Sequence, residues 1–382
     1  MIYYGHQHIT NEDIEAVREV LTSDFLTQGP AIERFERSVA GYCSAAYAVA
    51  VTNATAALHI ACQAAGLGKG DVLWTSPVTF VASANCARYC GADVDFVDID
   101  DKTYNMSVAA LEKKLKTAKK LPKVVVPVHL AGQSCAMQRI WELSREYGFT
   151  VIEDASHAIG GSYQKDQVGS CTYSDMTVFS FHPVKIITTG EGGMVLTNRQ
   201  ELCNALQLYR SHGITRDPAR MTRTADGPWY YEQIALGCNY RMTDLQAALG
   251  ESQMTKLDAF VARRRQLVRR YHEKLNGLPI RTPYCLPEAN PAWHLYIVRL
   301  DLDRVKKSKQ EIFAGMKEHG VMLNLHYIPV HLQPYYRDLG FGDGDFPVSE
   351  QYYREALTLP LYYDLTDAQQ DAIIAALRDV LA

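Results

Sequence analysis

The sequence lacks the features that mark several large classes of protein. No stretch of its 382 residues approaches the roughly 18 uninterrupted apolar residues of a membrane span, and the segment from Met1 to His6 has no secretory signal pattern. There is no internal repeat and no low-complexity segment. Its nine cysteines form no Cys-x-x-Cys pair, which is typical of reduced thiols packed as small hydrophobic side chains. These absences predict a cytoplasmic globular protein.

The chain also has little excess charge of either sign. Its 39 basic and 43 acidic residues give a formal net charge of -4, which offers no reason to expect nucleic acid or an anionic membrane as partner. The densest basic run, from Arg263 to Arg270, carries apolar residues at helical spacing. Such a run is typical of a solvated helix face rather than of a binding patch.

Strand-like and helix-like segments alternate from about residue 47. The strand candidates are residues 47–52, 72–75, 94–97, 124–128 and 150–152, and the helix candidates between them are 56–65, 80–89, 108–116 and 138–147. Two helices, at 10–21 and 32–42, precede this pattern. The alternation predicts an α/β fold with a mostly parallel sheet, whose functional site lies at the carboxyl ends of the strands.

The pattern changes near residue 250. The segment after it contains one long helical stretch at 251–275, strand candidates at 293–300 and 321–326, and helix candidates at 309–319 and 366–381. We therefore expect a large domain over residues 1–250 and a smaller α+β domain over residues 251–382. Residues 215–232 contain prolines and a glycine and read as a surface loop near the site.

Lys185 is the most informative residue of the chain. A β-prone run, residues 176–181, leads into this lysine, and the glycine-rich segment TTGEGG follows it. A lone lysine at the end of a strand is usually a surface residue. Here, however, Asp154 ends another strand candidate and His157 follows it in the next turn. A lysine able to form a Schiff base and an acid able to face a pyridinium nitrogen are what pyridoxal phosphate chemistry requires.

The sequence also contains a candidate binding site for the cofactor phosphate, the phosphate cup. Residues 52–57 follow a strand and open a helix, where free backbone N–H groups and the hydroxyl of Thr55 suit an anion. Alone, this segment is an ordinary helix cap, and its position ahead of Asp154 and Lys185 favours the functional reading. Ser180 is a second candidate phosphate donor or a plain strand serine. Phe80 either covers a face of the cofactor ring or belongs to the core.

The histidines near residue 330 suggest a metal at first sight. His326, Tyr327 and His331 are close in sequence, but no acid or cysteine at ligand spacing accompanies them, and Pro329 indicates a loop. We therefore expect substrate contact or packing here, and no metal.

Taken together, these motifs resemble the DegT/DnrJ/StrS family of sugar aminotransferases. The resemblance rests on SFHPVKIITTGEGG around Lys185, EDASHA around Asp154 and GCNYRMTDLQAALG around Asn239, and it covers nearly the whole chain from Leu26 onward. Within the family, the chain is most similar to the pseudaminic-acid branch, on the segments SFHPVK, RSHGITRD and HYIPVHLQPYYRDLG.

The resemblance implies a fold-type I enzyme that uses pyridoxal 5'-phosphate, with a mixed sheet in the large domain, a small C-terminal domain and a homodimer. It implies that Lys185 binds the cofactor as a Schiff base, that Asp154 meets the pyridine nitrogen and that His157 contacts the ring region. Phe80, which stands where some relatives carry tryptophan, would keep ring stacking. The implied phosphate contacts are Ala54, Thr55 and Ser180, with Asn239 reaching the partner's site. The implied sugar contacts are Tyr4, Leu26, Thr27, Gln28, Asn53, Arg241, His326 and Tyr327.

The implied reaction is a ping-pong transfer. L-Glutamate would leave its amino group on the cofactor as pyridoxamine phosphate, which would pass it to C4 of a UDP-linked 4-keto-6-deoxy-N-acetylhexosamine. Lys185 would serve as the base in both halves. Transamination of another nucleotide 4-keto or 3-keto sugar, of a cyclitol or of an amino-acid-like ketone remains open.

Two readings from other classes are weaker. Pyridoxamine-phosphate-dependent sugar dehydrases carry histidine where this chain has Lys185. A non-catalytic regulatory protein of this fold would not need Lys185 and Asp154, and no DNA-binding helix or basic tail is attached.

Overall fold

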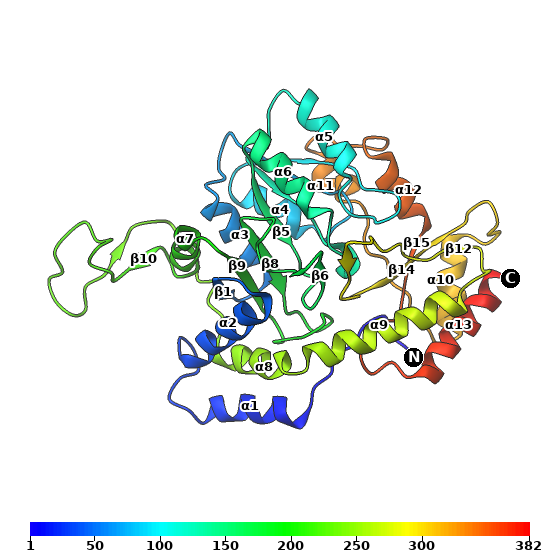
Figure 1. Cartoon of the computed structure of the whole chain (residues 1–382), viewed down its shortest axis with the longest axis horizontal. Helices are drawn as coiled ribbons and strands as arrows, with labels where there is room; N and C mark the ends of the chain where they lie inside the picture. Colours follow the sequence, from blue (N-terminus) through cyan, green and yellow to red (C-terminus); the bar gives the residue numbers. More distant parts are fainter.

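A seven-stranded sheet forms the centre of the computed structural model, which describes all of residues 1–382 (Figure 1). Its strand order is β1-β9-β8-β5-β4-β2-β3. The strands are β1 (Tyr47–Val51), β2 (Val72–Thr75), β3 (Asp93–Phe96), β4 (Val124–Val126), β5 (Thr150–Asp154), β8 (Met176–Ser180) and β9 (Gly193–Thr197). β9 runs antiparallel to both of its neighbours, and the other neighbouring strands are parallel. The predicted α/β fold with a mostly parallel sheet is confirmed.

Helices cover both faces of this sheet. One face packs against α3 (Ala54–Ala64), α4 (Ala82–Tyr89) and α7 (Gln200–Arg210). The other face packs against α2 (Pro30–Cys43) and α8 (Asp244–Met254) near β1 and β9, and against α5 (Val108–Thr117) and α6 (Met137–Tyr147) near β4 and β5. All five residues of β8 are buried, as expected for a strand that is covered on both faces. The first helix, α1 (Asn11–Leu21), packs on α8.

The C-terminal part has a core of its own. Buried residues between 267 and 380 pack around a three-stranded sheet of β12 (Ile280–Arg281), β14 (Tyr296–Leu300) and β15 (Ala356–Leu359). Helices α9 (Leu257–Lys274), α10 (Lys309–Glu318) and α13 (Asp367–Leu381) pack on it. This separate core supports the domain division near residue 250, which stays a proposal. No helix combines the length and the apolar character that crossing a membrane requires.

Short elements complete the chain. They are β6 (Ser162–Tyr163), β7 (Asp166–Gln167), β13 (Ala289–Asn290), α11 (Pro334–Arg337), α12 (Pro347–Glu355) and the 3-10 turns η1 (Leu130–Gly132) and η2 (Val330–Leu332).

Two expected elements differ from the structure. The single helix expected at 251–275 is interrupted. One helix, α8, ends at Met254 and the next, α9, begins at Leu257. At this break the ammonium of Lys256 lies 2.7 Å from the fully buried carboxylate of Asp13, which ties the turn to the start of α1. The strand expected at 321–326 does not form, since this segment makes only single bridges, to Ile2 on one side and to Thr358 on the other.

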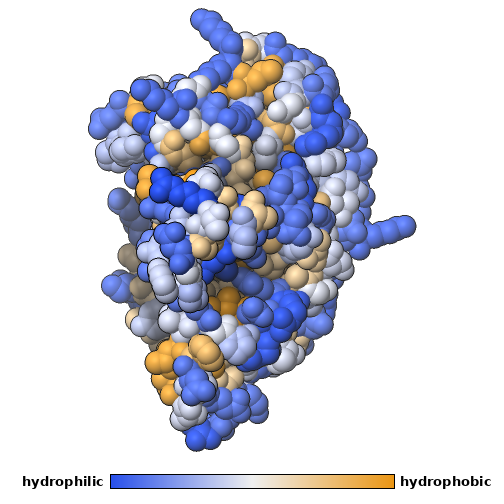
Figure 2. Space-filling model, turned by 90° about the vertical axis from the view of Figure 1, so that its left-hand side faces the viewer, coloured by the Kyte–Doolittle hydropathy of each residue, from blue (hydrophilic) through white to orange (hydrophobic).

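An arm projects from the body beyond α7 (Figure 1). β10 (Ile214–Thr215) and β11 (Glu232–Gln233) pair with each other within it. Three of its apolar side chains are exposed: Trp229 at 70%, Tyr231 at 50% and Leu236 at 83%. The face on this side of the molecule is mostly hydrophilic, with separate hydrophobic patches (Figure 2). Large apolar side chains that gather on a projection are typical of a surface that another chain covers.

Close packing of α8 on α2 at Gly250 leads to a first prediction. A Cβ at Gly250 would lie 2.6 Å from Phe35 Cζ and 2.7 Å from Thr189 Cγ2. We expect Gly250→Ala to lower the free energy of unfolding by about 1–3 kcal/mol through overpacking. At Gly41 in α2, a Cβ would meet nothing within 4 Å, so Gly41→Ala should raise that free energy by about 0.5–1 kcal/mol. Urea unfolding measures both, and two changes of the same sign would contradict this packing.

Candidate active site

A cavity of about 1080 Å³ lies at the carboxyl ends of β5 and β8. The start of α3, the loop before α4, the N-terminal segment and residues 324–327 complete its wall. Eleven of the predicted site residues line it: Tyr4, Asn53, Ala54, Thr55, Phe80, Asp154, His157, Ser180, Lys185, His326 and Tyr327. These predicted residues from six separate stretches of sequence therefore share one cavity.

Lys185 follows β8 in a turn and is the only lysine or arginine in the cavity wall. Its backbone N–H donates to the carbonyl of His182 at 2.9 Å, which fixes the turn. Burial lowers the pKa of Lys185 from its ordinary value of 10.5 to about 8, although the nearby charge of Asp154 acts in the opposite direction. A substantial share of this amine is therefore uncharged, and so nucleophilic, near neutral pH.

Hydroxyl groups orient the buried carboxylate of Asp154, the last residue of β5. Its Oδ2 accepts a hydrogen bond from Ser83 Oγ at 2.6 Å, and its Oδ1 accepts one from Ser156 Oγ at 2.6 Å. Thr79 Oγ1 lies 2.8 Å from Ser83 Oγ and extends this chain of hydroxyl groups. The sequence gives no signal for Ser83, which lies 71 positions before the acid that it contacts.

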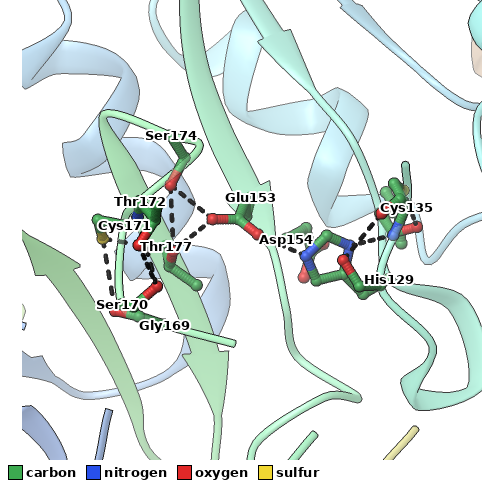
Figure 3. A network of polar contacts seen from close by, with 12 residues as sticks. His129, Cys135, Glu153, Asp154, Gly169, Ser170, Cys171, Thr172, Ser174 and Thr177 are labelled. Atoms are coloured by element: carbon green, nitrogen blue, oxygen red, sulfur yellow. Dashed lines mark hydrogen bonds and ion pairs between the residues drawn. The ribbon is translucent and has the colours of Figure 1, made fainter. Parts of the chain in front are cut away.

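A second buried network lies behind this acid (Figure 3). Glu153 Oε2 lies 2.6 Å from His129 Nε2, while its Oε1 accepts hydrogen bonds from Ser174 at 2.5 Å and Thr177 at 2.9 Å. The backbone N–H of Cys135 donates to His129 Nδ1 at 3.2 Å, so the hydrogen of the ring sits on Nε2 and points at Glu153. Burial alone would raise the pKa of Glu153, but these donors hold it below its ordinary value. The network anchors the end of β5.

The predicted phosphate cup is the start of α3. Asn53 caps this helix by accepting the N–H of Ala56 at 2.8 Å. The N–H groups of Ala54 and Thr55 have no partner within the chain and point out of the helix start, where an anion is favoured. A Cβ at Gly193 would lie 2.5 Å from the carbonyl carbon of Asn53 and 2.6 Å from the nitrogen of Ala54. Only glycine lets β9 pass this close to the cup.

Neutral imidazole and phenol groups form another part of the wall. His157 Nε2 lies 3.2 Å from Tyr327 Oη, and His157 Nδ1 is buried without a partner. Burial, Lys185 and His326 together hold the pKa of His157 well below its ordinary value, and burial raises that of Tyr327. His294, which lies in a predicted strand, also lines the cavity, with its ring centroid 4.5 Å from that of His157.

Five predicted residues do not line the cavity of their own chain: Leu26, Thr27, Gln28, Asn239 and Arg241. Thr27 pairs with Thr243, and the carboxylate of Asp244 accepts hydrogen bonds from the N–H groups of Gly29 and Ala31. No residue of the loop at 215–232 lines this cavity either, so its expected position near the site is not met within one chain and stays a prediction for a second copy. The reason is that the arm extends away from the body (Figure 1).

The chain matches known proteins over almost its whole length. The model of the DegT/DnrJ/EryC1/StrS aminotransferase family matches residues 7–378. This chain belongs to that family. Among curated relatives, the spore coat polysaccharide biosynthesis protein SpsC of Bacillus subtilis is 38% identical over 99% of this chain and 96% of that protein.

Solved structures are similar as well. PseC of Helicobacter pylori, an aminotransferase involved in the biosynthesis of pseudaminic acid, superposes with a TM-score of 0.91 at 28% identity, covering 100% of this chain and 99% of PseC. Spr1654 of Streptococcus pneumoniae, solved in its PMP form, superposes with a TM-score of 0.90 at 29% identity, covering 99% of this chain and 98% of Spr1654. The chain is thus a sugar aminotransferase of fold type I, as the sequence motifs predict.

The cofactor of the family is pyridoxal phosphate, and Spr1654 is known in both PLP and PMP forms. The residues of this cavity fit that group. The free N–H groups at Ala54 and Thr55 suit its phosphate, the fixed carboxylate of Asp154 suits its pyridine nitrogen, and the orphaned Nδ1 of His157 offers a polar contact beside the ring. Lys185 supplies the amine that binds it.

The pKa of Lys185 gives a second prediction. In the cofactor-free protein, the uncharged fraction of this amine should grow as the pH rises through about 8. The rate at which it captures pyridoxal phosphate, followed by the absorbance of the bound cofactor, should rise about tenfold per pH unit below that point and level off above it. Lys185→Ala protein, measured in parallel, accounts for other lysines. A rate that keeps rising to pH 10 would contradict a buried amine.

Proposed function

We propose that this chain moves the amino group of L-glutamate to C4 of a UDP-linked 4-keto-6-deoxy-N-acetylhexosamine, UDP-2-acetamido-2,6-dideoxy-β-L-arabino-hexos-4-ulose, in pseudaminic acid biosynthesis. The observation that carries transamination is that Lys185 shares one cavity with Asp154 and the start of α3, where burial lowers the pKa of its amine. The choice of sugar is supported by the segments RSHGITRD and HYIPVHLQPYYRDLG and by the likeness to PseC.

Each residue has a defined part in the proposed reaction. Pyridoxal phosphate supplies an electron sink that makes the Cα proton of the amino donor removable. The Asp154 carboxylate, fixed by Ser83 and Ser156, would accept a hydrogen bond from the pyridine nitrogen of the bound cofactor and would favour its protonated form. With the cofactor bound, Lys185 Nζ would accept the proton that leaves the donor Cα in the first half of the reaction. In the second half it would donate a proton to C4 of the sugar.

One base serves both halves because it sits on a rigid support. Lys185 follows β8, whose residues are all buried, and its turn is closed by the bond from its own N–H to the carbonyl of His182. A base held in this way reaches two nearby carbon atoms without rearrangement of the backbone. The neutral side chains of His157 and Tyr327 exclude water from the reacting carbons.

We further propose that the working enzyme is a homodimer. A nucleotide sugar carries a diphosphate, yet Lys185 is the only lysine or arginine in the cavity wall of one chain. Arg216, Arg220 and Arg223 lie on the projecting arm, and Asn239 and Arg241 follow it. An arm that exposes Trp229 and carries arginines suits the mouth of a second copy's cavity.

The substrate assignment is tested with a panel of UDP- and dTDP-linked 4-keto-6-deoxy sugars, with L-glutamate as donor. We expect amination at C4 of the UDP-N-acetyl sugar, identified by mass spectrometry and NMR, and loss of turnover in Lys185→Ala by at least about 10³-fold. Amination of dTDP sugars alone would overturn the sugar assignment. It would favour a different nucleotide keto-sugar. Wild-type turnover by Lys185→Ala would overturn the role of the lysine.

Mixing two inactive variants tests the dimer. If Asn239 serves the partner's site, a chain with Lys185→Ala and a chain with Asn239→Ala should each be inactive alone but should form heterodimers with one intact site. After joint refolding or co-expression in equal amounts, we expect roughly a quarter of wild-type activity, since half of the dimers are mixed and each has one working site. A mixture that stays inactive would place Asn239 in its own chain's site. A fully active monomer in sedimentation would remove the dimer from the proposal.

A further inference from the structure

His294 is a buried polar residue in the cavity that the cofactor assignments leave unused. It is 3% exposed, it comes from the C-terminal part of the chain and its Nδ1 has no hydrogen-bond partner. Buried polar atoms without a partner are uncommon in folded proteins. The other ring nitrogen, Nε2, also makes no hydrogen bond within the chain but is not closed off from the cavity that His294 lines, so a ligand there can supply its missing partner.

Arg264 lies directly behind this histidine and is equally unusual. It is 2% exposed, and no aspartate or glutamate pairs with it. Its Nη1 donates only to the backbone carbonyls of Trp293 at 3.3 Å, His294 at 3.2 Å and Leu361 at 2.9 Å. A buried charge is normally compensated by an opposite charge. The guanidinium thus places an uncompensated positive charge one layer behind the cavity wall.

The segment that carries His294 is held rigidly. The N–H of Ala292 donates to the carbonyl of Gly132 at 3.1 Å, and the N–H of Leu295 donates to that of Ala131 at 3.3 Å. A Cβ at Gly132 would lie 2.8 Å from the nitrogen of Trp293, so the two segments touch backbone to backbone. The ring of His294 is therefore presented to the cavity in a fixed position, as a preorganised binding group needs to be.

We propose that His294 binds the α-carboxylate of the amino donor, with Arg264 behind it as a fixed positive charge. The inference rests on the proposed function, which names L-glutamate as donor. In an α-amino acid each carboxylate oxygen lies within about 4 Å of the amino nitrogen, so the carboxylate must bind close to the position of the Lys185 amine. His294 meets that condition, since its ring centroid lies 4.5 Å from that of His157 and the charge of Lys185 is near enough to lower its pKa.

The charges in the wall leave few other anchors for a carboxylate. Lys185 is engaged in the chemistry and is the only lysine or arginine there, and His326 Nδ1 already bonds Thr358 Oγ1 at 2.9 Å. Burial, His157, Lys185 and Arg264 hold the pKa of His294 well below its ordinary value. The ring is thus neutral and offers one N–H to the carboxylate, while Arg264 supplies the charge.

The test uses cofactor-loaded His294→Phe, which keeps the ring volume and removes both nitrogens. We expect the KM for L-glutamate to rise at least about tenfold, and the dissociation constant of 2-oxoglutarate for the pyridoxal form, measured by calorimetry, to rise by a similar factor. The KM for the sugar substrate and the thermal midpoint should stay as in the wild type. His294→Asn, which keeps a hydrogen-bond donor, should recover part of the loss.

The matched control is His319→Phe, at the end of α10, where the ring is 40% exposed and lies 3.0 Å from Asp379. It should change neither constant. An unchanged KM for L-glutamate and an unchanged dissociation constant of 2-oxoglutarate in His294→Phe would overturn the proposal, and so would a rise in the sugar KM alone.

Failure of the proposed function gives a different result. The wild type would then aminate no keto-sugar, while the dissociation constant of 2-oxoglutarate would still differ between the wild type and His294→Phe.

Discussion

Desolvation of one amine beside a buried carboxylate is the interaction on which this site depends. At pH 7 an amine with the ordinary pKa of 10.5 is uncharged in about one molecule in 3,000, whereas with a pKa of about 8 it is uncharged in about one in ten. The uncharged fraction of the amine is thus roughly 300-fold higher, although the charge of Asp154 favours the charged form, so burial is the stronger effect. Because His326 and Tyr327 contribute to that burial, the C-terminal part of the chain prepares the nucleophile as well as enclosing the site.

The strand order explains why the required groups meet. β5 and β8 are parallel neighbours, so Asp154 and the turn that holds Lys185 emerge at the same edge of the sheet. β9 is antiparallel to both β8 and β1, so β1 points the same way as β8 and delivers the start of α3 to that edge. The network of Glu153 and His129 then fixes the end of β5 from behind (Figure 3). The acid, the amine and the anion cup are thus consequences of one topology.

Much of this arrangement follows from local sequence patterns. Three short-range signals each identify one part of the site. They are the apolar run before Lys185, the acid that ends the strand at Asp154 and the helix cap at Asn53. Features that depend on distant partners escaped prediction. Ser83 contacts an acid 71 positions away, and at the break before Leu257 Lys256 pairs with the distant Asp13. The sequence predicts a strand at His294, and nothing in its neighbourhood along the chain indicates the cavity that this residue lines.

The positions of the positive charges relate the cavity to the C-terminal part of the chain and to the arm. Both proposed substrates are anions, L-glutamate with its carboxylates and the sugar with its diphosphate, whereas one chain offers its cavity a single lysine that the chemistry occupies. The buried charge of Arg264 lies behind the wall formed by the C-terminal part, and the arginines of the arm lie far from their own cavity. In our proposals, therefore, each anion has a separate source of positive charge. The amino donor is held by its own chain and the nucleotide by the arm of the second copy, so the two substrates can use one base in turn without sharing an anchor.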